Sequence, residues 1–278
     1  VDQRLKKIEE FWSTGKLDEN SNVQFGEGGA GTFSDGKLTT GIKDSRIRKV
    51  LEELVTAGAP AEILYKQKPH IGTDLLRIVV KNIRNEIIRL GGEVRFGMRL
   101  EDIQLSESGD QIESILVWNR RENRIEALPC RVLILAVGHS ARDTFRMLKE
   151  RGFAMKQKPF SIGLRIEHSQ DMVDIAQYGK PARELGLPVA EYKLSYRCEE
   201  DGSAGNPYLP PADYRLSCHF PEGDSAYTFC MCPGGQVIGA SSQIGGVVTN
   251  GMSYHDRDSG TANSALLCDV RTDDFGDS

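Results

Sequence analysis

The chain has 278 residues, of which 39% are hydrophobic and 27% are charged, and its formal net charge is -5. This composition is typical of a globular protein with one large domain or two ordinary ones, and no basic stripe of the kind that binds nucleic acid is present. No apolar run approaches the roughly 20 residues that cross a bilayer, and VDQRLKKIEE lacks the apolar segment of a signal peptide, so we expect a cytoplasmic protein with a small-molecule substrate and neither a nucleic-acid nor a membrane partner.

Three amphipathic helices are predicted in the first third of the chain, because apolar residues recur there at intervals of three and four. Thr73 can cap the third helix, and Gly91 and Gly92 end it. The predicted helices cover residues 1–15, 44–57 and 73–90.

The Gly-rich segment GEGGAGTFSDGKLTT at 26–40 contains two overlapping nucleotide-binding patterns. Residues 26–31 satisfy the dinucleotide pattern G-x-G-x-x-G, and residues 31–37 match the start of the P-loop pattern G-x-x-x-x-G-K-[ST]. Both motifs need a buried strand before the loop and a helix after it, and the P-loop needs Ser or Thr where this chain has Leu38. We therefore reject both literal interpretations. Six glycines among 26–41 still favour a ligand-lining loop over a flexible surface loop.

A β-meander is predicted next, from extended segments at 93–105, 111–119 and 124–129. The unbroken apolar run 132–137 then predicts a strand buried on both faces of a parallel sheet, and residues 141–150 predict a helix. From Lys158 the chain changes to shorter strand-like segments such as SIGLRIEH and AEYKLSYRC.

The expected fold class is α/β, with a first domain at 1–157 and a smaller β-rich (α+β) domain at 158–278. Residues 201–226 are rich in Gly, Pro, Ser and Asp and predict a surface insertion in the second domain. No terminating element is recognisable in CDVRTDDFGDS at the end of the chain.

Six cysteines without a C-x-x-C pair predict reduced thiols rather than a disulfide scaffold. Cys218, His219, Cys230 and Cys232 could in principle bind zinc, but their spacing matches no familiar site. We therefore expect no metal.

Four segments resemble a known family: NVQFGEGGAGTFSDGKLTT at 22–40, RVLILAVGHSARDTF at 131–145, PFSIGLRIEH at 159–168 and CMCPGGQVIGASSQIGGVVTNGMSYHDRD at 230–258. The family comprises bacterial FAD-dependent dehydrogenases of the glutathione-reductase-like fold. The resemblance implies that 1–157 is part of an FAD/NAD(P)-binding Rossmann-like domain with the β-meander as an insertion, and that 158–278 is a substrate domain. Family members carry a strand-GxGxxG-helix unit upstream of the matching region, so we expect this chain to represent an incomplete FAD domain.

The resemblance also implies which residues contact the cofactor. An Ala-x-Gly turn after the parallel strand would pass close to FAD, and the strand in GGEVRFG would meet the adenine through Val94 or Arg95, although plain strand packing explains Val94 equally well. The Gly-rich loop would run past the pyrophosphate and the isoalloxazine, with the Lys37 charge near flavin N1 or the phosphates unless it is a solvated surface group. The implied cofactor-binding residues outside the last segment are Gly28, Gly29, Ala30, Gly31, Thr32, Ser34, Lys37, Val94, Ala136, Val137, Gly138 and His139.

In the last segment the resemblance places Gly246, Asn250 and Gly251 beside the flavin on its substrate side. His255 is the candidate acid or base there, although a lone histidine is more often structural. Cys230 and Cys232 could exchange electrons with a flavin. However, closing a disulfide between two cysteines that are separated by one residue is strained.

These observations leave three hypotheses open. The first is a segment of an FAD-dependent oxidoreductase that transfers hydride between a substrate and the flavin. The second is a non-catalytic remnant that does not bind flavin tightly, and the third and weakest is a P-loop-like nucleotide-binding protein. NAD(P)H is a possible reductant of the parent protein without a fingerprint in this chain, and neither the substrate nor the oligomeric state follows from the sequence.

Overall fold

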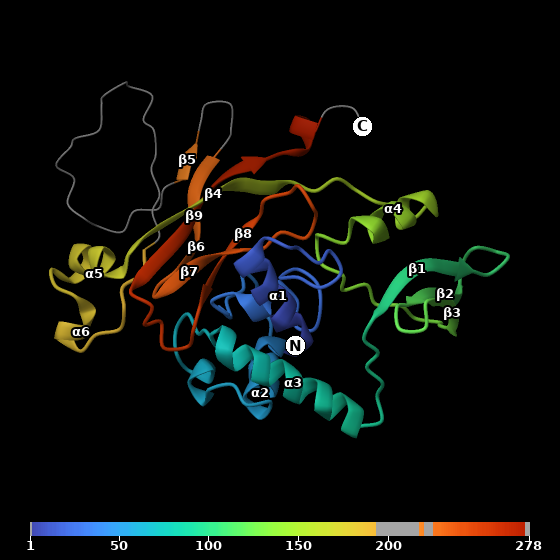
Figure 1. Cartoon of the computed structure of the whole chain (residues 1–278), viewed down its shortest axis with the longest axis horizontal. Helices are drawn as coiled ribbons and strands as arrows, with labels where there is room; N and C mark the ends of the chain where they lie inside the picture. Colours follow the sequence, from blue (N-terminus) through green and yellow to red (C-terminus); the bar gives the residue numbers. More distant parts are fainter. Residues whose placement is uncertain (1, 193–216, 220–224, 276–278) are drawn as a thin grey trace. The chain divides into compact units, whose positions relative to one another are not determined.

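The computed structural model describes residues 2–192, 217–219 and 225–275, and contacts divide the chain into two compact units. One unit comprises 1–83 together with 158–278, and the other comprises 84–157 (Figure 1). Residues 1–83 thus pack in one unit with 158–278, whereas the sequence division groups them with 84–157. The assignment of a flavin domain and a substrate domain stays a prediction.

The three helices predicted in the first third of the chain are confirmed. They are α1 (Asp2–Thr14), α2 (Arg46–Thr56) and α3 (Thr73–Arg89), with short 3₁₀ helices η1 (Ala30–Phe33) and η2 (Ala61–Leu64) between them. The predicted capping role of Thr73 is wrong, because Thr73 lies inside α3 and its hydroxyl donates to the Thr32 carbonyl at 2.6 Å. This bond instead attaches the start of α3 to the Gly-rich loop.

The C-terminal part of the first unit is built on antiparallel strands. The larger sheet has the order β4-β9-β6-β5, and β7 pairs with β8 in a separate hairpin. The strand predicted from SIGLRIEH is confirmed as β4. The elements are β4 (Phe160–Ser169), α5 (Gln170–Tyr178), α6 (Ala182–Leu185), β5 (Ser217–His219), β6 (Ser225–Cys232), β7 (Gly235–Gly239), β8 (Thr249–Ser253), β9 (Thr261–Val270) and η3 (Thr272–Phe275).

Two expectations for this region change. The predicted insertion at 201–226 falls largely outside the described residues, but 217–219 and 225–226 belong to the four-stranded sheet. The end of the chain, which carried no recognisable element, contributes β9, whose ten residues pair with β4 from Phe160 to Ser169. Pairing with a distant strand, rather than a local turn signal, defines this element.

The second unit confirms the meander and the helix after it. Its strands β1 (Met98–Leu105), β2 (Ile112–Asn119) and β3 (Arg124–Pro129) pair in that order, and α4 (Arg142–Glu150) follows. Arg151, at the end of α4, forms an ion pair with Asp102 of β1. This contact fixes the helix beside the first strand.

The buried parallel strand predicted at 132–137 is wrong. These residues form no strand, and the side chains of Val132 and Ile134 are 82% and 85% exposed. A buried parallel strand needs hydrogen-bonded neighbours on both edges, and every strand pair described in this structure is antiparallel. The apolar composition of this run predicted a strand, but the described chain supplies no strand beside it. The fold is mixed α and β with small antiparallel sheets.

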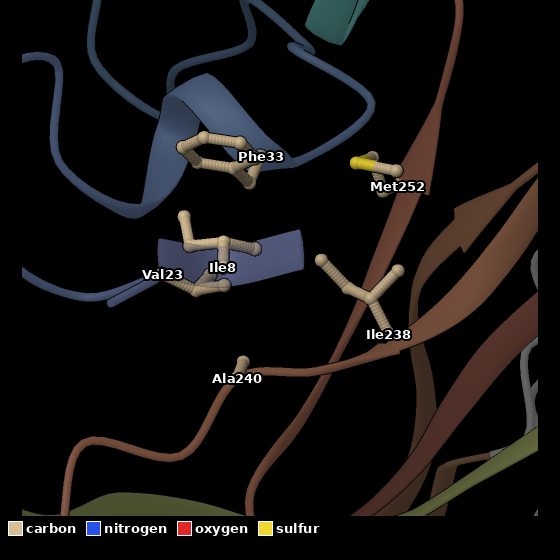
Figure 2. Packing of buried hydrophobic residues seen from close by; sticks show 6 residues of the cluster. All are labelled: Ile8, Val23, Phe33, Ile238, Ala240 and Met252. Atoms are coloured by element: carbon tan, nitrogen blue, oxygen red, sulfur yellow. The ribbon is translucent and has the colours of Figure 1, made fainter. Parts of the chain in front are cut away.

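One hydrophobic cluster joins α1, the Gly-rich loop and the β7–β8 hairpin. In Figure 2 the Phe33 ring lies over Ile8 of α1, with Met252 of β8 and Ile238 of β7 beside them. The cluster comprises Ile8, Val23, Phe33, Ile238, Ala240 and Met252. The loop is consequently part of the core and not an appendage. Within the described ranges no helix is long and apolar enough to span a bilayer.

We predict that Phe33→Ala lowers the free energy of unfolding by about 3–5 kcal/mol, because Phe33 is fully buried and its removal leaves a cavity between helix and hairpin. Urea denaturation of this chain measures the change. Tyr65→Ala, at a side chain 77% exposed, is the control and should change stability by less than about 0.5 kcal/mol. Equal effects of the two substitutions would contradict this assignment of the core.

Candidate functional site

A buried arginine from α1 holds the Gly-rich loop in shape. The Arg4 guanidinium donates to four backbone carbonyls, those of Asn22 at 2.8 Å, Val23 at 2.6 Å, Glu27 at 2.8 Å and Gly29 at 2.8 Å. Burial lowers the pKa of Arg4 to about 10, opposed by the charge of Glu27, so the group remains a cation at neutral pH. Sequence reasoning missed this residue, since an arginine in an amphipathic helix is ordinarily exposed.

The loop folds tightly where glycine permits it. Gly28 has φ of 81°, and a Cβ there would lie 2.0 Å from the Thr32 hydroxyl. In contrast, a Cβ on Gly29 or Gly31 would meet no atom within 4 Å. One face of the loop is thus packed against the protein, and the other has room for a ligand to approach the backbone.

The predicted loop residues and the predicted residue Asn250 meet in the structure. The side-chain amide of Asn250 donates to the Phe33 carbonyl at 3.1 Å. Ser34 closes the loop locally, because its hydroxyl donates to the Gly31 carbonyl at 2.7 Å and accepts the Gly36 N–H at 3.0 Å. Because Asn250 belongs to β8 and Phe33 ends η1, the Asn250 hydrogen bond attaches β8 directly to the end of η1.

The carboxylate of Asp35 is the electrostatic centre of this region. Arg257 donates to both carboxylate oxygens, at 3.0 Å and 2.7 Å, and Lys37 Nζ lies 2.7 Å away. The Ser253 hydroxyl supplies a further hydrogen bond. Burial of Asp35 raises its pKa, but Lys37 and Arg257 outweigh it and hold the pKa at about 2. Asp35 is therefore ionised throughout the physiological range.

Lys37 is engaged inside the protein rather than solvated. Its ammonium group also donates to the carbonyl of Met231, and its side chain is 23% exposed. No helix begins at this lysine; instead Lys37 forms an isolated antiparallel bridge with His70. The arrangement lacks the helix on which a P-loop depends.

His255 stacks on His70, with ring centroids 5.3 Å apart. Its Nδ1 lies 3.1 Å from the Ile71 carbonyl, which only accepts, so Nδ1 carries the proton and Nε2 of the neutral ring is free to accept one. Nε2 is 3.9 Å from a Glu62 oxygen, and the side chain is 25% exposed. Burial, followed by the charge of Arg257, lowers the pKa of His70. His255 thus has a fixed tautomer and partial access, as an acid or base requires.

Gly251 of β8 lies against a second polar cluster. A Cβ at this position would be 2.3 Å from Arg165 Nη1, 2.5 Å from Asn263 Oδ1 and 2.7 Å from Cys232 Sγ. Only glycine leaves space for these three groups. The predicted site residue Gly251 is therefore required by close packing, whatever it contributes to ligand binding.

The remaining predicted residues lie elsewhere. Gly246 lines a pocket of about 520 Å³ between the end of α1 and residues 241–249. Val94 lies in the second unit, in a loop rather than the predicted strand, and lines a pocket of about 390 Å³. Ala136, Val137, Gly138 and His139 belong to the same unit, in non-strand backbone at the end of the predicted strand and just after it.

The zinc hypothesis involves side chains outside those described, namely Cys218 and His219. No group of three or more His, Cys, Asp or Glu side chains suited to a metal occurs among those that the structure describes.

Comparison with known proteins relates the C-terminal part of the chain to flavoproteins. Residues 159–204 and 200–278 match the family described as FAD-dependent protein, C-terminal domain-like. A protein of Clostridium beijerinckii (strain ATCC 51743 / NCIMB 8052), described as an uncharacterized protein, is 48% identical over 275 residues, which cover 99% of this chain and 46% of the relative. The chain thus spans about half the length of the curated relative. The match supports relationship to an FAD-dependent family.

We predict that Asp35→Asn lowers the free energy of unfolding at pH 7 by about 2–3 kcal/mol, because Arg257 and Lys37 lose their buried counter-charge and each unit of the pKa shift of Asp35 corresponds to about 1.4 kcal/mol. The pKa of Asp35 is lower in the folded protein than the unfolded value of about 3.9, so its contribution is present above that value and is lost as the pH falls towards 2. Urea denaturation across this range should show the two proteins converging. Asp256→Asn, at an exposed neighbour of Arg257, should behave like the wild type; a gap between wild type and Asp35→Asn that persists at pH 2 would contradict the assignment.

Proposed function

We propose that this chain is a segment of a cytoplasmic FAD-dependent oxidoreductase that transfers hydride between a small-molecule substrate and the flavin. The observation that carries the proposal is the family match at 159–278. Polar contacts join the Gly-rich loop to this matched part of the chain. Asp35 of the loop binds Arg257 and Ser253 of the matched part, and Phe33 binds Asn250. On this proposal the parent protein has a glutathione-reductase-like fold, and residues 1–157 belong to its Rossmann-like FAD domain.

On this proposal the cofactor lies on the open side of the loop. Gly29 and Gly31 leave open space over the backbone, and Lys37 and Arg257 place positive charge behind it. Bound FAD would supply the hydride-accepting ring. In this chain Gly28–Ser34 would bind and orient the cofactor, while Asn250 would keep the loop against β8.

His255 is the proposed acid or base of the site. The Ile71 carbonyl fixes its tautomer, and Asp74 accepts its backbone N–H at 2.9 Å. These contacts orient Nε2, which could exchange a proton with a substrate. The alternative, a remnant without tight flavin binding, differs by predicting no interaction between this chain and FAD.

We predict that the full-length Clostridium beijerinckii relative purifies with the absorption spectrum of an oxidised flavin. If the protein is colourless and stays so after reconstitution with FAD and removal of excess cofactor, the flavoprotein proposal is wrong. Titration of the present chain with FAD, followed by flavin fluorescence, separates the remaining hypotheses. Quenching supports FAD binding by this chain. If the relative contains flavin but the present chain does not quench FAD fluorescence, the result supports the hypothesis of a remnant without tight flavin binding.

We further predict that Gly29→Ala weakens FAD binding at least about tenfold, because the added methyl group occupies the open side of the loop, where a ligand approaches the backbone. Fluorescence titration measures the affinity, and thermal unfolding reports the fold. Gly109→Ala is the matched control, since Gly109 has a similar positive φ and open surroundings in the β1–β2 turn. Equal affinities of the two variants would remove the loop from the binding site.

A further inference from the structure

The strand β6 contains a bulge at its pair of cysteines. Phe229 pairs with Ala265 and Cys232 pairs with Asn263, so two residues of β6, Cys230 and Met231, stand opposite one residue of β9. Cys230 adopts φ of 49°, a conformation that is uncommon for a residue with a side chain. Bulges bend a strand and redirect side chains, and strained backbone of this kind gathers at functional sites.

Two cationic side chains are attached to the bulge itself. Arg165 Nη1 lies 3.4 Å from the Cys230 carbonyl, and the Lys37 ammonium donates to the Met231 carbonyl. The Cys232 thiol donates to the Cys230 carbonyl at 3.3 Å. Its side-chain interaction with the Cys230 sulfur, together with the charges of Lys37 and Arg165, outweighs burial and lowers the pKa of Cys230 to about 6. The same side-chain interaction, together with burial, raises the pKa of Cys232. Cys230 is thus the more acidic thiol of the pair.

A buried amide beside the thiols has a hydrogen-bond donor to spare. Asn263 is fully buried and its Oδ1 accepts from Arg165, but its Nδ2 has no acceptor among the described residues. A buried N–H without an acceptor is costly, so such groups commonly serve a ligand or a reaction. Asn263 stands opposite Cys232 in the sheet, at the same face of Gly251 as the Cys232 sulfur.

We propose that Cys230 and Cys232 form a peroxide-reactive dithiol that closes to a reversible disulfide. In the first step the Cys230 thiolate attacks one oxygen of a hydroperoxide, the O–O bond breaks, and the leaving alkoxide or hydroxide takes a proton to give an alcohol or water. Cys230 becomes a sulfenic acid. In the second step the Cys232 sulfur attacks that of Cys230, the Cys232 proton is lost, and the sulfenic oxygen leaves as water.

The environment suits each thiol to its step. Cys230 is partly accessible and is the more acidic of the two thiols, as suits the attacking thiol, whereas Cys232 is fully buried and the less acidic. Once Cys230 is a neutral sulfenic acid, its negative charge no longer opposes ionisation of Cys232. Arg165 contacts the bulge at the Cys230 carbonyl and also Asn263 Oδ1, and on this proposal Arg165 and the Asn263 amide stabilise the developing oxygen charge. An undistorted strand separates residues i and i+2 by about 6.6 Å, near the limit for a disulfide, and the bulge bends the strand between them.

This inference does not depend on flavin binding, and its test uses the chain alone. Trypsin releases residues 216–257 as one peptide, which contains Cys218, Cys230 and Cys232. In the Cys218→Ser background the peptide therefore carries only the proposed pair. After one equivalent of hydrogen peroxide, we expect this peptide to lose the mass of two hydrogen atoms and to resist maleimide until dithiothreitol is added. With Cys232→Ser as well, dimedone should trap Cys230 as a sulfenic acid.

The rate of oxidation distinguishes a peroxide-reactive site from ordinary thiols. At pH 7 Cys230 should react with hydrogen peroxide at least about tenfold faster than the exposed Cys268 in the same sample. Lys37→Gln should move the pH midpoint of Cys230 alkylation upward, whereas Lys49→Gln, at an exposed lysine, should not, with circular dichroism verifying the fold of both. Equal rates at Cys230 and Cys268, or a Cys230 sulfenic acid that persists while Cys232 is present, would overturn the proposal.

Discussion

The buried carboxylate of Asp35 connects parts of the chain that are far apart in sequence. Its partner Arg257 is 222 positions away, and Ser253 lies on the adjoining strand β8. A charge in the interior is tolerated only when its hydrogen-bonding capacity is filled, so the loop, Lys37 and the segment after β8 must adopt their positions together. The hydrophobic contact of Phe33 with Met252 reinforces the same connection (Figure 2). These contacts hold the Gly-rich loop in one conformation.

Two sites share this support. On one side of Lys37 are Asp35 and the loop to which we assign the cofactor, and on the other are Met231 and the thiol bulge. One ammonium group therefore affects both the carboxylate and the Cys230 thiolate. A change in either site is expected to alter the electrostatics of the other, because the charges lie close together in surroundings of low dielectric constant.

Local sequence patterns predicted the local structure well. The helices α1 to α4 and the three-stranded meander carry their own periodicity and turn residues, and all are present. The apolar run 132–137 misled the prediction, because pairing depends on neighbouring strands and not on the run itself. Glycine density indicated a ligand-lining loop. The roles of Arg4 and Asp35 could not be recognised in the sequence, because their partners become adjacent only on folding. The bulge at Cys230 arises from the register of β6 against β9, which composition does not reveal.

The most direct test of FAD binding by the Gly-rich loop and β8 is amide hydrogen exchange of this chain with and without FAD. The account predicts that FAD slows exchange at residues 28–37 and 250–255, because these segments form one connected surface. The exposed turn at 106–111 in the other unit serves as an internal reference and should not change. Unchanged exchange at 28–37 with saturating FAD, or protection confined to segments outside both ranges, would contradict the claim that the loop and β8 together hold the flavin.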